Sequence, residues 1–329
     1  MKSFLKKGMG MVAATAVMGA FAAPAVADKH DKYPDRPIKM IVAYSPGGAT
    51  DIVARLIGVE MEKLLGQPIV IDNKPGGGSN IGTAEAARAK PDGYTLLLAT
   101  IAQAINPAVY SKLAYDTKKD FEPVVLTMSS PSILVVNPNV PAKTAGELVA
   151  WAKANPGKLT MASSGAGGSP HMAAELLKLR TGIDYLHIPY KGASPAMNDV
   201  LSGVVMGGFK TATAAIPQIK AGKVRALAVA APQRLAQLPD LPTMAEAGFP
   251  DFNVASWNGV LAPAGTPKAI VDKLNAVINE VLKNPKVVAQ FEKRAAVPVG
   301  GSPGYFRAFI DKELKTWAAV AKKANLKIN

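Results

Sequence analysis

The chain has 329 residues, with 38 lysines and arginines against 24 aspartates and glutamates, three histidines and no cysteine. The lack of cysteine excludes a disulfide-stapled scaffold, thiol catalysis and cysteine-ligated metal sites. The net charge of +14 raises the question of whether nucleic acid is a partner, but the lysines are scattered and aromatic residues make up only 6% of the chain. We therefore expect no nucleic-acid partner and a general attraction for anions.

The first 27 residues predict a secretory signal peptide. Three lysines among the first seven residues precede an apolar, small-residue stretch at 8–23, and Ala25-Val26-Ala27 forms an A-x-A cleavage site. The stretch is short and rich in alanine and glycine, which argues against a membrane anchor. We expect cleavage after Ala27 and a soluble protein in the periplasm.

Beyond residue 36, apolar runs typical of strands alternate with helical stretches. The expected strands are 37–44, 68–72, 94–99, 121–128, 132–137, 158–163, 184–188, 204–209, 224–230 and 252–261. The expected helices are 50–65, 80–89, 144–154, 170–180, 195–202, 213–221, 267–283, 286–294 and 303–324. Alternating βα units of this kind predict an α/β fold with mainly parallel sheets covered by helices on both faces.

The order of the elements indicates two lobes. The chain is long enough for two domains, since domains usually run roughly 100–200 residues. Its last third is largely helical, as expected of a chain that leaves one lobe, builds a second and returns. We predict lobe 1 from 28–128 plus 254–329 and lobe 2 from 129–253.

A glycine loop follows the first strand, in the segment AYSPGGATD at 43–51. Glycines let backbone N–H groups approach a ligand closely, and a helix start carries partial positive charge. No G-K-[ST] follows and no G-x-G-x-x-G occurs, so a nucleotide phosphate is not indicated. The loop predicts a carboxylate seat. We expect Asp51 to complement the helix dipole and accept N–H bonds from its own loop.

A second loop of the same type lies in TMASSGAGGSPHMA at 160–173, where a short strand again leads through glycines into a helix. Ligands of open α/β sheets bind at the carboxyl ends of strands, at such turns. Two matched loops that face each other across a cleft would hold a small organic acid from both sides. His171 is expected to donate to the bound acid or to anchor the loop.

An exported serine hydrolase remains the alternative, with Ser302 or Ser169 as nucleophile and His171 as base. Residues 300–304 match G-x-S-x-G. Pro303 follows the serine, however, and a long helix begins there, so Ser302 is expected to cap that helix. No metal-binding spacing is present. We expect a binding protein that is not an enzyme and that needs no cofactor or metal.

Six segments resemble the Bug receptors, the extracytoplasmic solute-binding proteins of tripartite tricarboxylate transporters. They are PDRPIKMIVAYSPGGATDIVARL, PGGGSNIGTAEAARAKPDGYTLLLAT, SSGAGGSPHMAAELLK, IPYKGASPAMNDVLSG, AGKVRALAVAAPQRLAQLPDLPTMAEAG and WNGVLAPAGTP. The resemblance spans 33–325. It implies a Venus-flytrap fold and a periplasmic receptor that passes its ligand to integral membrane transporter subunits. We expect a monomer.

The resemblance also implies a carboxylate seat on the two loops. Carried onto this sequence, it comprises Tyr44, Gly47, Gly48, Ala49, Thr50, Asp51, Ser164, Gly165, Gly167, Gly168, Ser169 and His171. Met206 stands where the family often has an aspartate, and Lys210 where it often has an acidic or small polar residue. A lysine facing the cleft would favour a di- or tricarboxylate, and the alternative is a solvated surface lysine. Trp257, near the returning crossover, is expected to sense the ligand.

Overall fold

A single 16-residue strand, β4 (Phe121–Val136), connects the two lobes of the computed structural model, which describes Met1 and residues 32–328. As far as Pro131 it pairs antiparallel with β9 (Ala255–Pro263). From Ser132 it pairs antiparallel with β7 (Gly207–Thr211) and β8 (Arg225–Ala230). Apart from Met1, the predicted signal peptide and its cleavage site lie outside the described residues.

The expectation of two strands, 121–128 and 132–137, is wrong because residues 129–131 between them do not form a turn. Ser130 is fully buried, and its hydroxyl donates to the Ala295 carbonyl over 3.1 Å. The strand therefore continues through them. Its change of partners at Pro131–Ser132 lies three residues beyond our lobe boundary, and the boundaries themselves stay a prediction.

Lobe 1 contains a mixed sheet in the order β2–β1–β3–β9–β4, with β10 on the free side of β4. Here β1, β2 and β3 are parallel, and β9 runs against β3. The remaining strands are β1 (Ile38–Val42), β2 (Ile69–Asn73), β3 (Thr95–Thr100) and β10 (Val297–Pro298). The helices are α1 (Ala49–Leu65), α2 (Asn80–Ala87), α3 (Ala102–Val109), α8 (Lys268–Lys283), α9 (Pro285–Glu292) and α10 (Pro303–Lys323).

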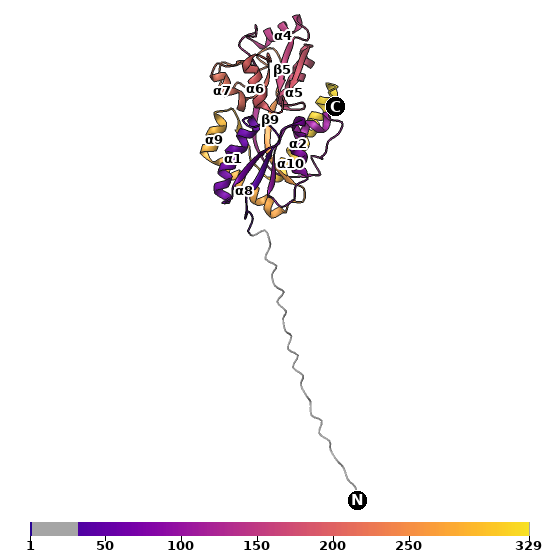
Figure 1. Cartoon of the computed structure of the whole chain (residues 1–329), viewed down its shortest axis with the longest axis vertical. Helices are drawn as coiled ribbons and strands as arrows, with labels where there is room; N and C mark the ends of the chain where they lie inside the picture. The colour runs from indigo at the N-terminus through magenta and orange to yellow at the C-terminus, as the bar shows by residue number, and fades with distance from the viewer. Residues whose placement is uncertain (2–31, 329) are drawn as a thin grey trace.

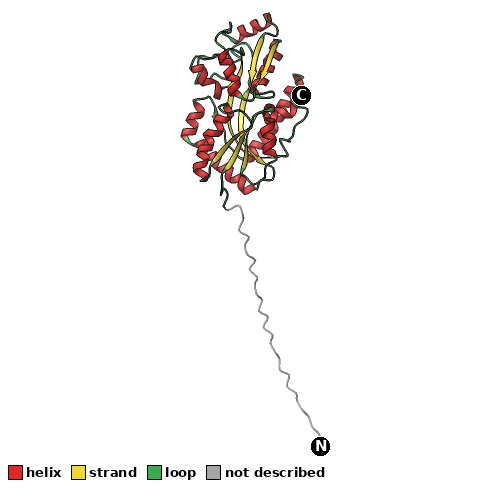
Figure 2. Cartoon of the chain, viewed as in Figure 1, coloured by secondary structure: helices red, strands yellow, loops and turns green. Residues whose placement is uncertain are grey.

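Lobe 2 repeats this architecture around the end of β4. The strands β5 (Leu159–Ser163) and β6 (Tyr185–Pro189) pair in parallel, and β5 also pairs in parallel with β7. Helices cover both faces of the sheets in each lobe (Figure 2). The helices of lobe 2 are α4 (Ala145–Ala154), α5 (Ser169–Thr181), α6 (Ala193–Ser202) and α7 (Ala212–Lys220), which gather at the upper end of Figure 1. No described helix is long and apolar enough to cross a membrane.

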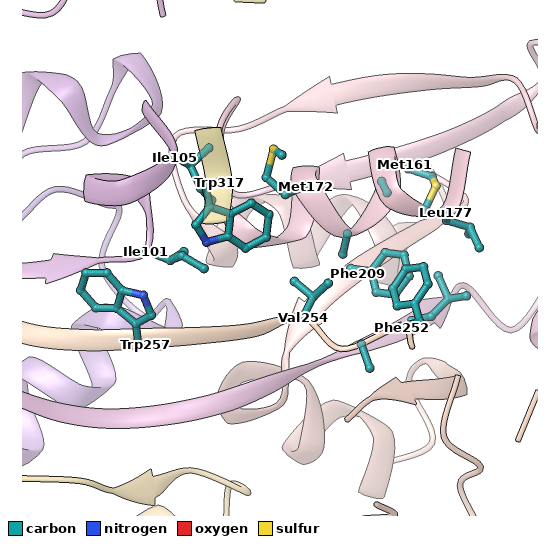
Figure 3. Packing of buried hydrophobic residues seen from close by; sticks show 14 of the residues in the cluster. Ile101, Ile105, Met161, Met172, Leu177, Phe209, Phe252, Val254, Trp257 and Trp317 are labelled. Carbon is teal, nitrogen blue, oxygen red and sulfur yellow. The ribbon is translucent and has the colours of Figure 1, made fainter. Parts of the chain in front are cut away.

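One apolar cluster extends across both lobes. In lobe 1 it includes Ile105 of α3 and Trp317 of α10, and in lobe 2 it includes Met161 and Phe209. Figure 3 shows Trp257 and Trp317 at one end and the ring of Phe209 stacked on that of Phe252 at the other, with centroids 5.6 Å apart. The lobes therefore share a core along one side of the strands that join them.

The helix boundaries follow the caps visible in the sequence. The Thr144 hydroxyl accepts the Glu147 N–H, and Gly66, Gly182 and Gly203 end α1, α5 and α6 in the left-handed conformation. The one described α-helix that the sequence did not predict is α3. It begins without a side-chain cap, and it contains Pro107, a residue that usually ends a helix, so the local sequence did not indicate a helix here.

Packing of β9 against α10 depends on a glycine. A Cβ at Gly259 would lie 2.2 Å from Cζ of Phe306. We expect Gly259→Ala to lower the free energy of unfolding by about 1–3 kcal/mol through overpacking. Gly146→Ala is the control, because its Cβ meets nothing closer than 4.0 Å, and it should raise stability by roughly 0.5 kcal/mol. Urea unfolding of both variants measures this. Wild-type stability for Gly259→Ala would contradict it.

Candidate functional site

The first glycine loop connects β1 to α1 and holds a tight turn at Gly47, whose φ is 76°. Gly47 donates its N–H to Oδ2 of Asp51, four residues on, over 2.9 Å. The first bond within α1 runs from the Ile52 N–H to the Gly48 carbonyl. Because the bonds of an α-helix begin there, the N–H groups of Ala49, Thr50 and Asp51 have no partner inside the helix.

Asp51 braces this loop and does not face the cavity described below. Its Oδ2 also accepts from Nε of Arg55 over 2.9 Å, and its Oδ1 accepts from the Asn73 amide over 3.0 Å. Burial raises the pKa of the carboxyl, but the hydrogen bonds from Arg55, Gly47 and Asn73 outweigh burial and hold the pKa below its ordinary value. The aspartate is thus ionised and fully engaged by its own lobe.

The second loop connects β5 to α5 with the same geometry. Gly167 has φ of 80°, and its N–H donates to Nδ1 of His171, again four residues on, over 3.1 Å. The first bond within α5 runs from the Met172 N–H to the Gly168 carbonyl. The amides of Ser169 and His171 are therefore free of helix bonds, and Pro170 has no N–H to offer.

His171 is held as a neutral ring. Its Nδ1 must be unprotonated to accept the Gly167 N–H, and its ring stacks on that of His187 with centroids 3.9 Å apart. Burial lowers the pKa of His171 to about 4. Burial, followed by the neighbouring His171, also lowers the pKa of His187 to about 4. His171 therefore has the same role in the second glycine loop (loop 2) as Asp51 has in the first (loop 1). Each side chain accepts a glycine N–H and so fixes the turn.

Both loops lead to one cavity between the lobes. Its lining consists of Tyr44, Gly48, Ala49, Thr50, Thr100, Ile101, Met128, Ser164, Gly168, Ser169, Ala193, Thr211, Ser256 and Asn258. Seven of these were predicted site residues: Tyr44, Gly48, Ala49, Thr50, Ser164, Gly168 and Ser169. Four predicted residues, Gly47, Asp51, Gly167 and His171, form the braces behind them, and Gly165 lies in the second loop beside Gly78.

The lobes touch beside the cavity. At the first loop, the Ser45 N–H and hydroxyl both contact the Lys191 carbonyl at 3.1 Å. At the second loop, the Tyr110 hydroxyl donates to the Ala166 carbonyl over 3.1 Å. A Cβ at Gly78 would lie 2.3 Å from that same carbonyl oxygen, so the backbones are in close approach. The structure is a closed arrangement of the two lobes.

Lys210 lies neither on the surface nor in the lining of this cavity, so the solvated-lysine alternative is wrong. Its side chain is buried, and Nζ donates to the carbonyls of Ala162 over 3.0 Å and Ala196 over 3.4 Å. Burial lowers the pKa of Lys210 to about 7. The lysine thus connects the end of β5 to the first turn of α6 behind the cavity wall.

Trp257 also lies outside the cavity lining, on the opposite face of β9 from Ser256 and Asn258. Side chains alternate along a strand, so neighbours in sequence face opposite ways. The ring packs edge-on against Phe306 and Phe309, and its Nε1 donates to Glu313 over 3.0 Å. A molecule in the cavity is reached by Ser256 and Asn258 instead.

Sequence reasoning missed half of the residues that line the cavity. The residues are Thr100, Ile101, Met128, Ala193, Thr211, Ser256 and Asn258. Two hints existed, because the expected helix 195–202 begins beside Ala193 and the predicted lobe boundaries lie beside Met128 and Ser256. Within the described part of the chain, five lining hydroxyls make no side-chain hydrogen bond: Thr50, Ser164, Ser169, Thr211 and Ser256.

The hydrolase candidates do not form a nucleophile–base pair in this arrangement. The Ser302 hydroxyl accepts the Tyr305 N–H over 3.1 Å and caps α10, as the sequence predicted. Nδ1 of His171 is committed to Gly167, and its Nε2 lies 3.7 Å from Oε1 of Glu175. Ser169 faces the cavity as a free hydroxyl at the start of α5.

Burial of Lys210 predicts a specific pH dependence. On folding, its pKa falls from 10.5 to about 7, so the unfolded chain binds the extra proton between these values. The contribution of this group to stability therefore improves as pH rises through that window. Lys210→Met removes it. The free energy of unfolding of the variant, relative to wild type, should be highest below pH 7. This advantage of the variant should shrink by up to about 1.4 kcal/mol per pH unit towards pH 10.

Urea unfolding at several pH values measures this difference, with exposed Lys223→Met as the control that should leave the pH profile unchanged. A difference for Lys210→Met that does not vary with pH would contradict the predicted titration.

The neutral state of His171 predicts acid sensitivity. Its folded pKa of about 4 lies below the ordinary 6.5, so the unfolded chain takes up the proton first. Stability is lost as pH falls through this window, by up to about 1.4 kcal/mol per pH unit. His171→Asn places an amide oxygen where loop 1 has the Asp51 carboxylate and should reduce the loss. His171→Ala should weaken the loop at every pH. Thermal unfolding between pH 4 and 7 checks this, and equal acid sensitivity in His171→Asn would contradict it.

Comparison with known proteins gives a consistent result over nearly the whole chain. Residues 53–326 match the protein family described as the tripartite tricarboxylate transporter family receptor. BugT of Bordetella pertussis is 39% identical over 328 residues, covering 97% of this chain and 100% of BugT. The structure of Rpa4515 of R. palustris with adipate is 35% identical, with a TM-score of 0.87, covering 90% of this chain and 99% of that one.

MatC from Rhodopseudomonas palustris with bound malate is 34% identical, with a TM-score of 0.85, covering 88% of this chain and 99% of MatC. These matches confirm the resemblance found in the sequence motifs. The chain belongs to the receptor family of the tripartite tricarboxylate transporters.

Proposed function

We propose that this protein is a periplasmic solute-binding receptor that captures a small organic carboxylate between its lobes. One observation carries the proposal: two glycine loops with the same i to i+4 brace open onto one cavity from opposite lobes. Each loop ends at a helix start with unbonded N–H groups, which favour an anion through direct hydrogen bonds and the helix dipole. Closure of the lobes would surround the bound acid.

The carboxylate is held by dipoles in this proposal. None of the 14 lining residues carries a charged side chain. The available donors are the helix-start amides of Ala49, Thr50 and Ser169 and the free hydroxyls around them. Charge-assisted hydrogen bonds of this type are roughly twice as strong as neutral ones. An acid is therefore favoured over its amide although no cationic side chain is present.

The rest of the ligand would meet neutral polar groups. Thr100, Thr211, Ser256 and Asn258 contribute such groups to the lining. Selection of a second carboxylate by Lys210, as expected from the sequence, does not fit its position behind the wall. We propose instead that hydroxyl and amide groups bind a second oxygen-rich group, carboxylate or hydroxyl. The adipate-bound and malate-bound relatives support a ligand with oxygen at both ends.

The same proposal covers location and partners. The predicted signal peptide would deliver the chain to the periplasm, where the receptor would act as a monomer. The integral membrane subunits of a tripartite tricarboxylate-type transporter would receive the ligand when the lobes open. Family membership supports that partner. Lobe 1 would comprise 28–128 and 254–329, and lobe 2 would comprise 129–253.

The test compares acids with matched amides. Calorimetry on ligand-stripped protein should detect binding of malate or adipate, with the corresponding diamides at least tenfold weaker. At a hundredfold excess over Kd, the bound acid should stabilise the protein by about 2.7 kcal/mol. Gly48→Val should weaken binding at least tenfold, because its φ of −81° suits valine, while the valine methyl groups would extend beyond a Cβ that already lies 3.4 Å from Ala193 in the lining. Gly304→Val in α10 is the control that should still bind.

Mass spectrometry of the molecule that co-purifies with the protein would identify the natural ligand. Failure of a broad panel of organic acids to bind or stabilise the stripped protein would contradict the receptor proposal. Turnover of an activated ester that disappears in Ser169→Ala or Ser302→Ala would favour the hydrolase instead.

A further inference from the structure

A second concavity lies behind the strands that form the cavity. Met128, Ser256 and Asn258 face the cavity, whereas the alternate residues Ser129, Pro131, Ala255 and Trp257 face this rear groove. Strand pleating places the two sets on opposite faces of β4 and β9. The groove has a volume of about 650 Å³, within the ≈ 300–1,000 Å³ usual for small-molecule sites.

Both lobes supply walls of the rear groove. Residues 230–237, after β8, form one wall, and the end of α9, β10 and α10 form the other. The walls are joined by the Gln237 side-chain amide, which donates to the Glu292 carbonyl. The groove is therefore a defined feature of the closed arrangement, on the face opposite the carboxylate cavity.

The floor of the rear groove is aromatic. Trp257, Phe309 and Trp317 line it, and the rings of Trp257 and Phe309 pack edge to face with centroids 5.5 Å apart. Val297, which also lines the groove, is 63% exposed. Such a surface suits an apolar ring, since aromatic side chains offer both dispersion contacts and a negative ring face to a cation.

A carboxylate sits among these rings. Oε2 of Glu313 accepts the Nε1–H of Trp257 over 3.0 Å and of Trp317 over 3.1 Å. Across the described residues, no lysine or arginine pairs with Glu313 or with Glu292 at the other wall. Arg234, the one cation in the lining, is already paired with Glu246 at 2.9 Å. In a protein of net charge +14 this groove is locally acidic.

We propose that the rear groove is a second binding site, for a small aromatic ammonium ion. The ring would lie against Phe309 and Trp317, and the ammonium group would donate to Glu313, whose position is fixed by the two indole N–H groups. Charge complementarity selects a cation here, in contrast to the anion selected by the glycine loops at the front. The indole bonds hold the carboxylate in place but leave its negative charge uncompensated.

The test uses 2-phenylethylammonium with 2-phenylethanol as its uncharged counterpart, in the absence of any organic acid. Calorimetry and tryptophan fluorescence should show saturable binding of the amine with Kd of about 1 mM or tighter, and binding of the alcohol at least tenfold weaker. Glu313→Gln should weaken amine binding at least tenfold. Glu62→Gln, an exposed position on α1, should not change it.

A second variant keeps the proposal testable if Glu313→Gln fails to fold. Thr316→Arg places a guanidinium in the groove, three residues from Glu313 on the same helix face, and should abolish amine binding. The proposal is overturned if the amine does not saturate by about 10 mM, if the alcohol binds as well, or if either groove variant binds like wild type. A concentration-dependent dimer that Thr316→Arg dissociates would assign the groove to a second copy and also overturn it.

Discussion

The antiparallel pairing of β4 with β9 is the constraint on which the remaining structure depends. These two strands carry the chain out of lobe 1 and back, so their hydrogen bonds fix the relation between the lobes. Their pleat also assigns side chains to two separate surfaces. Ser256 and Asn258 contribute to the front cavity, while Ala255 and Trp257 contribute to the rear groove. A one-residue change in register would exchange the two sets.

The two glycine loops have the same turn geometry but use different hydrogen-bond acceptors to fix it. Each turn needs an acceptor for one glycine N–H, placed one helical turn further on. Loop 1 uses the Asp51 carboxylate, whose charge is balanced by Arg55, and loop 2 uses the neutral ring of His171. A neutral acceptor adds no negative charge beside a bound anion. Loop 2 therefore presents the less repulsive of the two helix starts to a carboxylate.

The loops were predictable because their signals are local. Glycines between an apolar strand and a helix start are visible in sequence, as are the caps at Thr144 and Ser302. The other half of the lining had only indirect signals. Thr100, Thr211, Ser256 and Asn258 are single polar residues on three strands, β3, β7 and β9, and only the folded topology brings them together.

Lys210 illustrates the other limit. Its burial depends on two carbonyl acceptors, Ala162 and Ala196, that belong to different elements. No local pattern distinguishes such a lysine from a solvated one. Likewise, Ser129-Ser130-Pro131 within β4 has turn-like composition, but the Ser130 hydroxyl is satisfied by a tertiary contact, the Ala295 carbonyl. Tertiary partners overrule local propensity at both places.

The apolar cluster shared by the lobes has a thermodynamic consequence. Met172 and Phe252 of lobe 2 belong to the same cluster as Ile105 and Trp317 of lobe 1 (Figure 3). Melting of either lobe alone would expose apolar surface of the other. The lobes should therefore unfold together, in one heat-absorption peak whose calorimetric and van't Hoff enthalpies agree, although the chain visits each lobe separately.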